Sequence, residues 1–517
     1  MALAKNQLTE LTVIAVTGEG SGVARYTDAD TPAPGMVVFL PRTAIGDVVR
    51  TKIVKVQKNH AFGRVEEVLT ASPDRGADPC GGCAVFGRCG GCVWRHITYA
   101  AELRYKQQWV ADTLSRIGGL TIAPLPIVGA DEPDRYRNKA QFPVAPAQPG
   151  DADPFTPQIG FFAPRSHRIV PVRDCLLQPE SFAPVLDAVA DWMTQNGVLP
   201  YDETEHTGLL RHIYIRQGAV TGQMMVCLVC RSGRLPDVPG LICRVRAAAP
   251  QLTSLCVNLN RARTNVILGD DGFTLWGEDA ITDELCGLRF RLSPWSFYQV
   301  DHAQTERLYR LAAEAAALTG KETLLDLYCG TGTIGLSMAH RVRQLIGVEI
   351  VPAAVEDARR NAQQNGIDNA RFLCADAVAA ARQLSDEGVR PDVIVLDPPR
   401  KGCDPSLIRT MCAMAPSRIV YISCDPATLS RDLRLLDGEG YRTVQVQLSR
   451  IVLYHLKEKG FDREALRTEH LDQEKMEYLH TGKDSGKTHN YGLNFSDMDF
   501  LREFTGLSYQ IMFTGIE

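Results

Sequence analysis

The chain has 517 residues, a formal net charge of −5 and a hydrophobic content of 45%. This length predicts several domains with ample core, and the composition is that of an ordinary soluble protein. No apolar run is long enough to span a bilayer, and residues 1–10 lack a signal-peptide core, so we expect no membrane association and a cytoplasmic protein. Fifteen cysteines then predict reduced thiols plus a metal site. Because the net charge is mildly acidic, any face that binds nucleic acid must be local.

Residues 1–70 have the pattern of a small β-barrel. Turn clusters such as Gly18-Glu-Gly-Ser-Gly22 separate four strand patterns, at Leu11–Val16, Met36–Leu40, Val48–Val56 and Arg64–Leu69. The segment resembles the TRAM module, an OB-like barrel that binds RNA. Six basic residues and one acid, Asp47, lie between positions 41 and 64. Such a charge run is usually a solvated face, and contact with phosphates is the interpretation we favour here.

Residues 71–126 carry a cluster of thiols, Cys80-Gly-Gly-Cys-Ala-Val-Phe-Gly-Arg-Cys-Gly-Gly-Cys92. Clustered thiols among glycines indicate a metal site, because glycine lets several sulfurs converge. Two Cys-x2-Cys pairs would suit structural zinc, although the loop between them is short for that. Residues 98–118 then have helical spacing and end at Gly118-Gly119, and we expect this helix to pack on the domain at residues 291–456.

Residues 127–290 predict a second, strand-rich domain, in which Cys227 and Cys230 fall in an apolar strand and are expected in the core. Residues 291–456 then alternate apolar strands with helical segments. The first of these strands ends in Asp326-Leu-Tyr-Cys-Gly-Thr-Gly332, a glycine-rich turn before a helix. The next strand ends in Glu349, where a carboxylate can take ribose hydroxyls, and Asp376 is a candidate for an adenine edge.

Two more strands in residues 291–456 end in reactive groups. One precedes Asp397-Pro-Pro-Arg-Lys-Gly402, in which the prolines fix an extended lip. The other, at Ile419–Ile422, precedes Ser423-Cys-Asp-Pro-Ala-Thr-Leu-Ser-Arg-Asp432. Ligands of open α/β sheets bind at the carboxyl ends of strands, which places Cys424 as a candidate nucleophile. Taken alone, Cys424 is equally well read as a core thiol.

Together the three motifs resemble the RNA 5-methyluridine methyltransferase family, over about residues 10–446. The glycine motif resembles the S-adenosylmethionine pocket of class I methyltransferases more than a dinucleotide fingerprint, although such a fold also suits nicotinamide. The resemblance implies a multidomain α/β + β protein. It would comprise an N-terminal OB-like TRAM barrel, a strand-rich central domain with the cysteine cluster, and a C-terminal class I, Rossmann-like methyltransferase domain at residues 291–456.

The resemblance also implies the chemistry of these residues. Cys424 adds to C6 of uracil, S-adenosylmethionine methylates C5, and a carboxylate removes the C5 proton. Because only the thiolate attacks, we expect the site to lower the pKa of Cys424 below its ordinary value of about 8.5. The residues that match the family's S-adenosylmethionine contacts are Gln299, Tyr328, Glu349 and Asp397. A rival within the class is an amino-group methyltransferase built on Asp397-Pro-Pro, which would not need Cys424.

The cysteines resemble those of the iron–sulfur branch of the family. Cys83, Cys89 and Cys92 match its motif, and Cys175 stands where the fourth ligand lies, which implies a [4Fe–4S] cluster, with zinc as the alternative. That branch acts on 23S rRNA, so rRNA is the favoured substrate and tRNA the alternative. No obligate protein partner is evident.

Residues 457–517 depart from the family, whose catalytic domain ends in a His-Val-Glu segment with Glu as the base. Here His455 stands near the position of that histidine, and the nearest acid is Glu458, displaced by one residue. Glu458 is therefore the candidate base, and the alternative is that it is a surface residue in the run Lys457-Glu458-Lys459. If no base exists, the chain is a catalytically impaired RNA-binding assembly factor.

Overall fold

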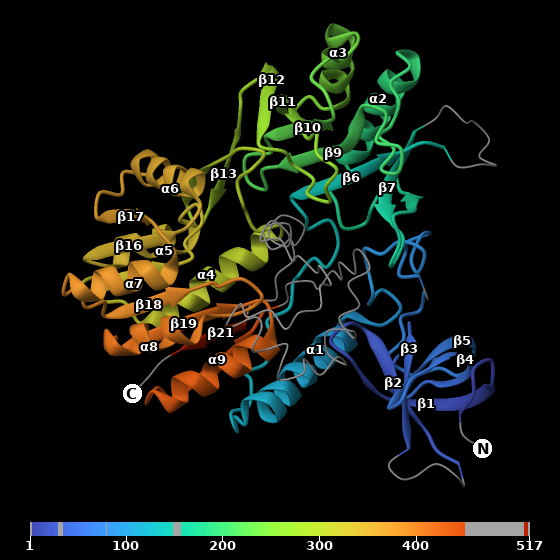
Figure 1. Cartoon of the computed structure of the whole chain (residues 1–517), viewed down its shortest axis with the longest axis horizontal. Coiled ribbons are helices and arrows are strands. Elements are labelled where there is room, and N and C mark those ends of the chain that lie inside the picture. Colours follow the sequence, from blue (N-terminus) through green and yellow to red (C-terminus); the bar gives the residue numbers. More distant parts are fainter. Residues whose placement is uncertain (1–2, 29–34, 79, 148–156, 450–510, 515–517) are drawn as a thin grey trace, which may run out of the picture.

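The computed structural model describes residues 3–28, 35–78, 80–147, 157–449 and, by backbone alone, 511–514. In this part of the chain no helix is long and apolar enough to cross a membrane. A barrel, a central sheet and a catalytic sheet follow one another along the sequence (Figure 1). Each has its own cluster of buried apolar side chains.

The N-terminal domain is a closed five-stranded barrel with the strand order β1-β2-β3-β5-β4. Inward positions along each strand carry small or branched apolar residues, as the two-residue period of a strand requires. The strands are β1 (Leu8–Val16), β2 (Ser21–Tyr26), β3 (Met36–Pro41), β4 (Val48–Val56) and β5 (His60–Thr70). The barrel expected from the sequence is present, and β2 is a strand that the pattern did not predict.

Helix α1 (Tyr99–Thr113) links the barrel to the catalytic domain. Thr98 caps its first turn by accepting a hydrogen bond from the Ala101 amide, and a π-helical turn at Leu114–Gly118 ends it. Val110 of α1 and Leu114 of the π-helical turn belong to the core of the catalytic domain, and α1 lies beside α9 (Pro426–Gly438) (Figure 1). The expectation that this helix packs on the catalytic domain is confirmed.

The central domain is a seven-stranded sheet with the order β12-β11-β10-β9-β6-β7-β8. Its central strands β9 (Leu210–Gln217) and β10 (Met224–Cys230) are buried almost throughout, Cys227 and Cys230 among them, so these two thiols are core residues as expected. The remaining elements up to the catalytic domain are β6 (Lys139–Ala145), β7 (Gln158–Phe162), β8 (Ile169–Pro171), α2 (Phe182–Gln195), α3 (Val238–Ala248), β11 (Leu252–Leu259), β12 (Asp271–Gly277), β13 (Ile281–Leu285) and β14 (Leu288–Leu292).

The catalytic domain is a doubly wound sheet with the order β17-β16-β15-β18-β19-β21-β20. Its first five strands are parallel and consist of apolar runs, because helices cover both faces. Its strands are β15 (Thr323–Leu327), β16 (Gln344–Glu349), β17 (Ala370–Cys374), β18 (Val393–Leu396), β19 (Arg418–Ser423), β20 (Gln445–Leu448) and β21 (Ile511–Thr514). Its helices besides α9 are α4 (His302–Ala316), α5 (Thr333–Met338), α6 (Pro352–Gln364), α7 (Ala377–Asp386) and α8 (Pro405–Ala413).

Strand β21 comes from the C-terminal segment that the sequence separates from the catalytic domain. It runs antiparallel between β19 and β20, and its register sets Ile511 opposite Ser423 and Leu448. Residues 511–514 therefore complete the catalytic sheet. No pattern in residues 457–517 indicated this pairing, because Ile511 lies 63 positions after Leu448 of β20 and 88 positions after Ser423 of β19.

Candidate active site

The parallel register brings the carboxyl ends of four strands together at the same end of the catalytic sheet. Leu327 of β15 is opposite both Val348 and Leu396, and Leu396 is opposite Tyr421 of β19. The residues that follow these strands therefore meet. The amide of Asp397 donates a hydrogen bond to the carbonyl of Leu327 at 3.4 Å. The charge of Asp397 in turn acts on the thiol of Cys424. The glycine motif, Asp397 and Cys424 thus form one site, as open α/β sheets require.

Cys424 is half-buried at the end of β19. Burial and the negative charges of Asp397 and Asp425 raise the pKa of its thiol to about 12, and the positive charge of Arg400 opposes them. The expectation of a lowered pKa is therefore wrong for the protein without ligands. The physical reason is that two carboxylates and low exposure outweigh one guanidinium. Sequence reasoning also did not assign a role to Arg400, although it stands in the Asp-Pro-Pro motif.

Asp326 is buried beneath the glycine loop. One carboxyl oxygen, Oδ2, accepts a hydrogen bond from the Gly335 amide at 2.8 Å, and the other, Oδ1, has no hydrogen-bond partner among the described residues. Burial, followed by the charges of Asp397 and Glu349, raises the pKa of Asp326 to about 8. A buried carboxyl oxygen without a partner is costly, so its surroundings favour a ligand with a polar group that can form a hydrogen bond with it.

Glu349 ends β16 and holds the glycine loop. Its Oε2 accepts from the Gly330 amide at 3.1 Å, and its Oε1 accepts from the amides of Ile350 and Val351 at 2.9 Å each. Gly330 has φ +55° and open space where a side chain would begin, and Tyr328 has φ +64°. The loop is thus a strained backbone cradle with room above Gly330, which fits a ligand that approaches the main chain closely.

Gln299 and Asp376, also named from the sequence, have defined structural contacts. The carbonyl of Gln299 accepts a hydrogen bond at 2.8 Å from the amide side chain of Asn138, which joins the central and catalytic domains. Asp376 caps α7, because its Oδ1 accepts from the amides of Val378 and Ala379 at 2.9 and 3.3 Å. His455 and Glu458 lie outside the described residues.

The four cysteines predicted as metal ligands are neighbours and are half-buried. Cys89 and Cys175 border one small apolar cluster, and Cys92 and Cys175 border another. Burial and the nearby thiols of Cys175 and Cys83 raise the pKa of Cys89 to about 11, although the amide of Gly91 donates a hydrogen bond to its sulfur. The donor set suits a metal that prefers sulfur. No group of three or more His, Cys, Asp or Glu side chains among the described residues has the geometry to hold a metal ion.

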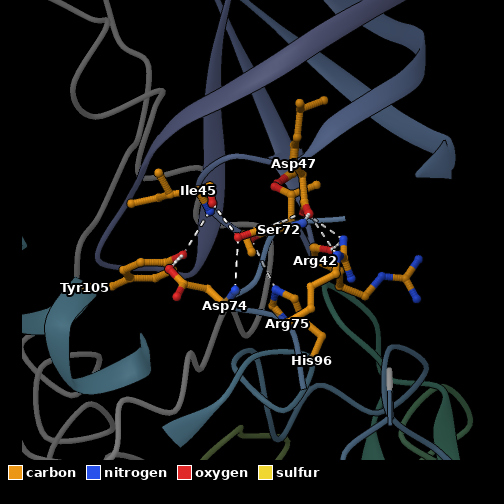
Figure 2. Close-up of polar contacts among 11 residues, drawn as sticks. Arg42, Ile45, Asp47, Ser72, Asp74, Arg75, His96 and Tyr105 are labelled. Atoms are coloured by element: carbon orange, nitrogen blue, oxygen red, sulfur yellow. Dashed lines mark hydrogen bonds and ion pairs between the residues drawn. The ribbon is translucent and has the colours of Figure 1, made fainter. Parts of the chain in front are cut away.

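A buried polar network joins the barrel to this cysteine-bearing segment (Figure 2). Asp47, fully buried, accepts from Arg75 at 2.9 and 2.8 Å and from the Ser72 amide at 2.9 Å. Tyr105 of α1 donates to Asp74 at 2.7 Å and accepts from the Ile45 amide at 3.0 Å. The one acid of the basic run in the barrel is thus a structural anchor. Sequence spacing did not indicate this role.

Two surface hollows, of about 580 and 340 Å³, lie beside the amino end of β17. Their lining includes Arg371 at the start of β17 and Asp368 before it. Because ligands of such sheets bind at the carboxyl ends of the strands, we assign the site to the Cys424 edge and not to these hollows.

Comparison with known proteins identifies the class. The sequence profile of the tRNA (Uracil-5-)-methyltransferase family matches residues 275–454, which include the glycine motif, Asp397 and Cys424. An uncharacterized RNA methyltransferase of Halalkalibacterium halodurans is 45% identical over 444 residues, which cover 86% of this chain and 93% of that protein. A further uncharacterized RNA methyltransferase, from Clostridium tetani, is 39% identical over 443 residues, with 86% and 93% covered. The fold and the site thus define an RNA methyltransferase.

The chain belongs to the family of RNA methyltransferases to which these relatives belong. Among solved structures, the tRNA (uracil-54, C5)-methyltransferase of Pyrococcus abyssi, in complex with S-adenosyl-L-homocysteine, superposes with a TM-score of 0.65. The two chains are 24% identical, and the match covers 85% of this chain and 96% of the other. This likeness shows the fold.

Proposed function

We propose that this protein transfers a methyl group from S-adenosylmethionine to C5 of a uridine in RNA, by way of a covalent bond between Cys424 and C6 of uracil. The observation that supports this proposal most directly is the position of Cys424. Its side chain is half-buried at the end of β19, where the charges of Asp397 and Arg400 act on it. A sulfur nucleophile is needed for this reaction, because C5 of uracil is a poor nucleophile until C6 has been attacked.

The residues of the site would act in order. A base takes the thiol proton of Cys424 and the sulfur adds to C6, which moves an electron pair toward C5. S-adenosylmethionine, when bound, supplies an electrophilic methyl group. After C5 has taken the methyl, a base removes the C5 proton, the electron pair of that bond re-forms the C5–C6 double bond, and the sulfur of Cys424 leaves as thiolate, which regains a proton and restores the enzyme. Because Cys424 cannot reach a stacked base, the target uridine would be flipped out, at a cost of a few kcal/mol.

The methyl donor would lie over the glycine loop. We propose Gln299, Tyr328, Glu349 and Asp397 as its contacts. Two observations support a ligand at this edge: the open space above Gly330, and the buried Oδ1 of Asp326, which lacks a hydrogen-bond partner among the described residues. Equilibrium binding of S-adenosylhomocysteine to wild type and to Gly330→Val, whose side chain would fill that space, tests this placement. Equal affinity of the two proteins would contradict it.

We propose 23S rRNA as the substrate, because the cysteine set resembles that of the rRNA branch. tRNA is the second candidate, favoured by the solved relative, which acts on uracil 54 of tRNA. Mapping 5-methyluridine in rRNA and tRNA from cells with and without the gene separates the two. Loss from 23S rRNA alone supports the first proposal, and loss from tRNA alone supports the second. RNA binding without loss of any methyl group would instead indicate an assembly factor.

Glu458 is the base that we propose to test first, because it is the acid nearest in sequence to the position of the family base. General-base help is typically worth about 10²–10⁴-fold. Glu458→Gln should therefore accumulate a covalent protein–RNA complex on denaturing gels after incubation with RNA and S-adenosylmethionine. Normal turnover of the variant would assign Glu458 to the surface and require another base.

We propose that the barrel holds RNA. Phe39, His60 and Phe62 form a ring cluster on β3 and β5, with centroids 5.2–5.6 Å apart. Their neighbours Val38, Leu40 and Ala61 are buried, so the three rings face outward. Aromatic rings beside a basic run suit stacking of bases. Phe62→Ala should weaken RNA binding while S-adenosylhomocysteine binding stays unchanged, and an unchanged RNA affinity would contradict this role.

We propose that Cys83, Cys89, Cys92 and Cys175 hold a [4Fe–4S] cluster with a structural role. Their half-buried thiols, gathered from two stretches of the chain, supply the chemistry that such a cluster takes. Protein purified without oxygen should be brown, with broad absorption at roughly 400 nm. Cys89→Ser should remove this absorption, and Cys80→Ser is the matched control. If metal analysis finds stoichiometric zinc and no iron, the site is a zinc site and the [4Fe–4S] assignment is wrong.

A further inference from the structure

Helix α9 begins two residues after Cys424, and its first two turns face the main chain of residues 398–403, which we call the lip. The lip follows Asp397 and includes Arg400. Thr428 donates from Oγ1 to the carbonyl of Arg400 at 2.9 Å. Arg431 donates from Nη2 to the carbonyls of Lys401 at 2.9 Å and Cys403 at 3.2 Å. Two side chains of α9 thus hold three carbonyl groups of the lip, those of residues 400, 401 and 403.

Asp432 is the buried centre of these contacts. Its carboxylate is fully buried, and its Oδ2 accepts from the amide of Cys403 and from the hydroxyl of Tyr421, each at 2.7 Å. Its Oδ1 accepts from Nε of Arg431 at 2.8 Å. One carboxylate therefore binds the lip, strand β19 and helix α9 together. A buried charge with partners on three elements fixes their relative position, because moving any element leaves the charge uncompensated.

The lip approaches α9 as closely as the backbone allows at Gly402. This residue has φ +73°, and a Cβ built there would lie 2.6 Å from Nη2 of Arg431 and would also meet Oδ2 of Asp432. Both the positive φ and the missing side chain are required for this contact. The glycine of the Asp-Pro-Pro-Arg-Lys-Gly motif thus serves the contact with Arg431 and Asp432.

The lip matters for Cys424 because of the charges beside it. Asp397, directly before the lip, Arg400 within it, and Asp425, the N-cap of α9, are the charged groups that act most strongly on the thiol. Coulomb energy varies with distance, so the position of the lip sets how strongly Asp397 and Arg400 act. Thr428, Arg431 and Asp432 are not among the groups that act most strongly on the thiol, but they hold the main chain of the lip.

We propose that Thr428, Arg431 and Asp432 are positioning residues, which hold the lip, and with it Asp397 and Arg400, at a fixed place relative to the sulfur of Cys424. This inference rests on the proposed function and deepens it. It also explains why the motif around Cys424 extends eight residues beyond the thiol, to Arg431 and Asp432. These two residues hold the motif that contains Asp397 at a fixed distance from the motif that contains Cys424, although the residues in contact are about 30 positions apart in the sequence.

The test uses the full-length protein and two matched pairs of variants. Arg431→Met removes the bonds to the lip, and Arg434→Met removes a similar charge from an exposed position of the same helix. Thr428→Val removes a hydroxyl without changing the shape of the side chain, and Thr428→Ser restores it. Two readouts are recorded: kcat and KM for RNA methylation, and the rate at which iodoacetamide alkylates Cys424 between pH 7 and 10, followed by mass spectrometry of its peptide.

We expect Arg431→Met to lower kcat about 10-fold to 100-fold, with little change in KM, because misplacement by about 1 Å is enough for such a loss. The alkylation profile of Cys424 should shift along the pH axis in the same variant. Thr428→Val should show smaller changes in the same direction, while Thr428→Ser and Arg434→Met should behave as wild type.

Wild-type kcat and an unshifted alkylation profile in both Arg431→Met and Thr428→Val would overturn the proposal. If Arg431→Met fails to fold, Thr428→Val alone decides, because it changes one hydroxyl. If wild type itself methylates no RNA, the proposed function fails, and the alkylation profile still shows separately whether the contacts from α9 position the charges beside Cys424.

Discussion

The surroundings of Cys424 differ from those of the cysteine cluster formed by Cys83, Cys89 and Cys92. Cys424 stands at the end of a buried strand, and hydrogen bonds from α9 fix the lip beside it. Cys83 and Cys89 stand in turns, where their backbone hydrogen bonds join residues three or four positions apart in the chain. The register of the sheet positions Cys424 before any ligand binds. The cysteine cluster is held by such short-range bonds, by contacts with two small apolar clusters and by the Asp47 network.

The largest effect should come from the nucleophile. Cys424→Ala should lower methyl transfer at least about 10⁴-fold while leaving the fold intact, because the side chain is half-buried at a strand end and is not part of the core. Methyl transfer from labelled S-adenosylmethionine and thermal unfolding measure the two effects. Cys412→Ala on α8 is the control, with wild-type activity expected. Activity retained in Cys424→Ala would favour the amino-group methyltransferase.

The next effect concerns the anchor of the cysteine segment. Asp47→Ala leaves Arg75 without its buried partner and should weaken this junction by about 3–5 kcal/mol. Hydrogen exchange of the amides in residues 72–97 should accelerate by more than about 100-fold, while exchange in β18 and β19 stays unchanged. Glu67→Ala, which breaks an exposed ion pair with Arg50, should change little. Equal effects of both variants would show that the Asp47 network does not hold the segment.

Asp326 should impose a pH dependence on the stability of the ligand-free protein. Its pKa is raised from an ordinary value of about 3.9 to about 8, so the folded state favours the protonated carboxyl. Its stabilising contribution is therefore complete below about pH 4 and is lost as pH rises toward 8, at up to about 1.4 kcal/mol per pH unit. Relative to Asp326→Asn, wild type should lose about 2 kcal/mol between pH 6 and 8. Denaturant unfolding at both pH values measures this, and parallel curves would refute it.

The smallest effect has opposite signs in two assays. Asp397→Asn removes a negative charge that raises the pKa of Cys424, so at pH 8 alkylation of this thiol should accelerate about threefold to tenfold. Methyl transfer should fall in the same variant, because Asp397 is a proposed contact of the methyl donor. Arg400→Gln should instead slow alkylation. A rise in both alkylation and methyl transfer after Asp397→Asn would remove Asp397 from the donor site.

The sequence by itself determined the order of the domains and the catalytic edge. Glycine-rich and proline-rich turns after apolar strands define local geometry, and parallel strands must end at one edge, so Asp326, Asp397 and Cys424 could be brought together without coordinates. The barrel and helix α1 followed equally from period-two and helical patterns. These inferences succeed because each rests on residues that are close in sequence.

Only the tertiary structure decided the features that depend on distant residues. The raised pKa of Cys424 depends on burial and on Asp397, which lies 27 positions earlier in the chain. The pairing of β21 with β19, the anchoring role of Asp47, and the contacts of Thr428, Arg431 and Asp432 with the lip were also absent from any local pattern. Their physical reason is the same: electrostatic and hydrogen-bond partners are selected by distance in space, which the spacing of residues along a chain does not encode.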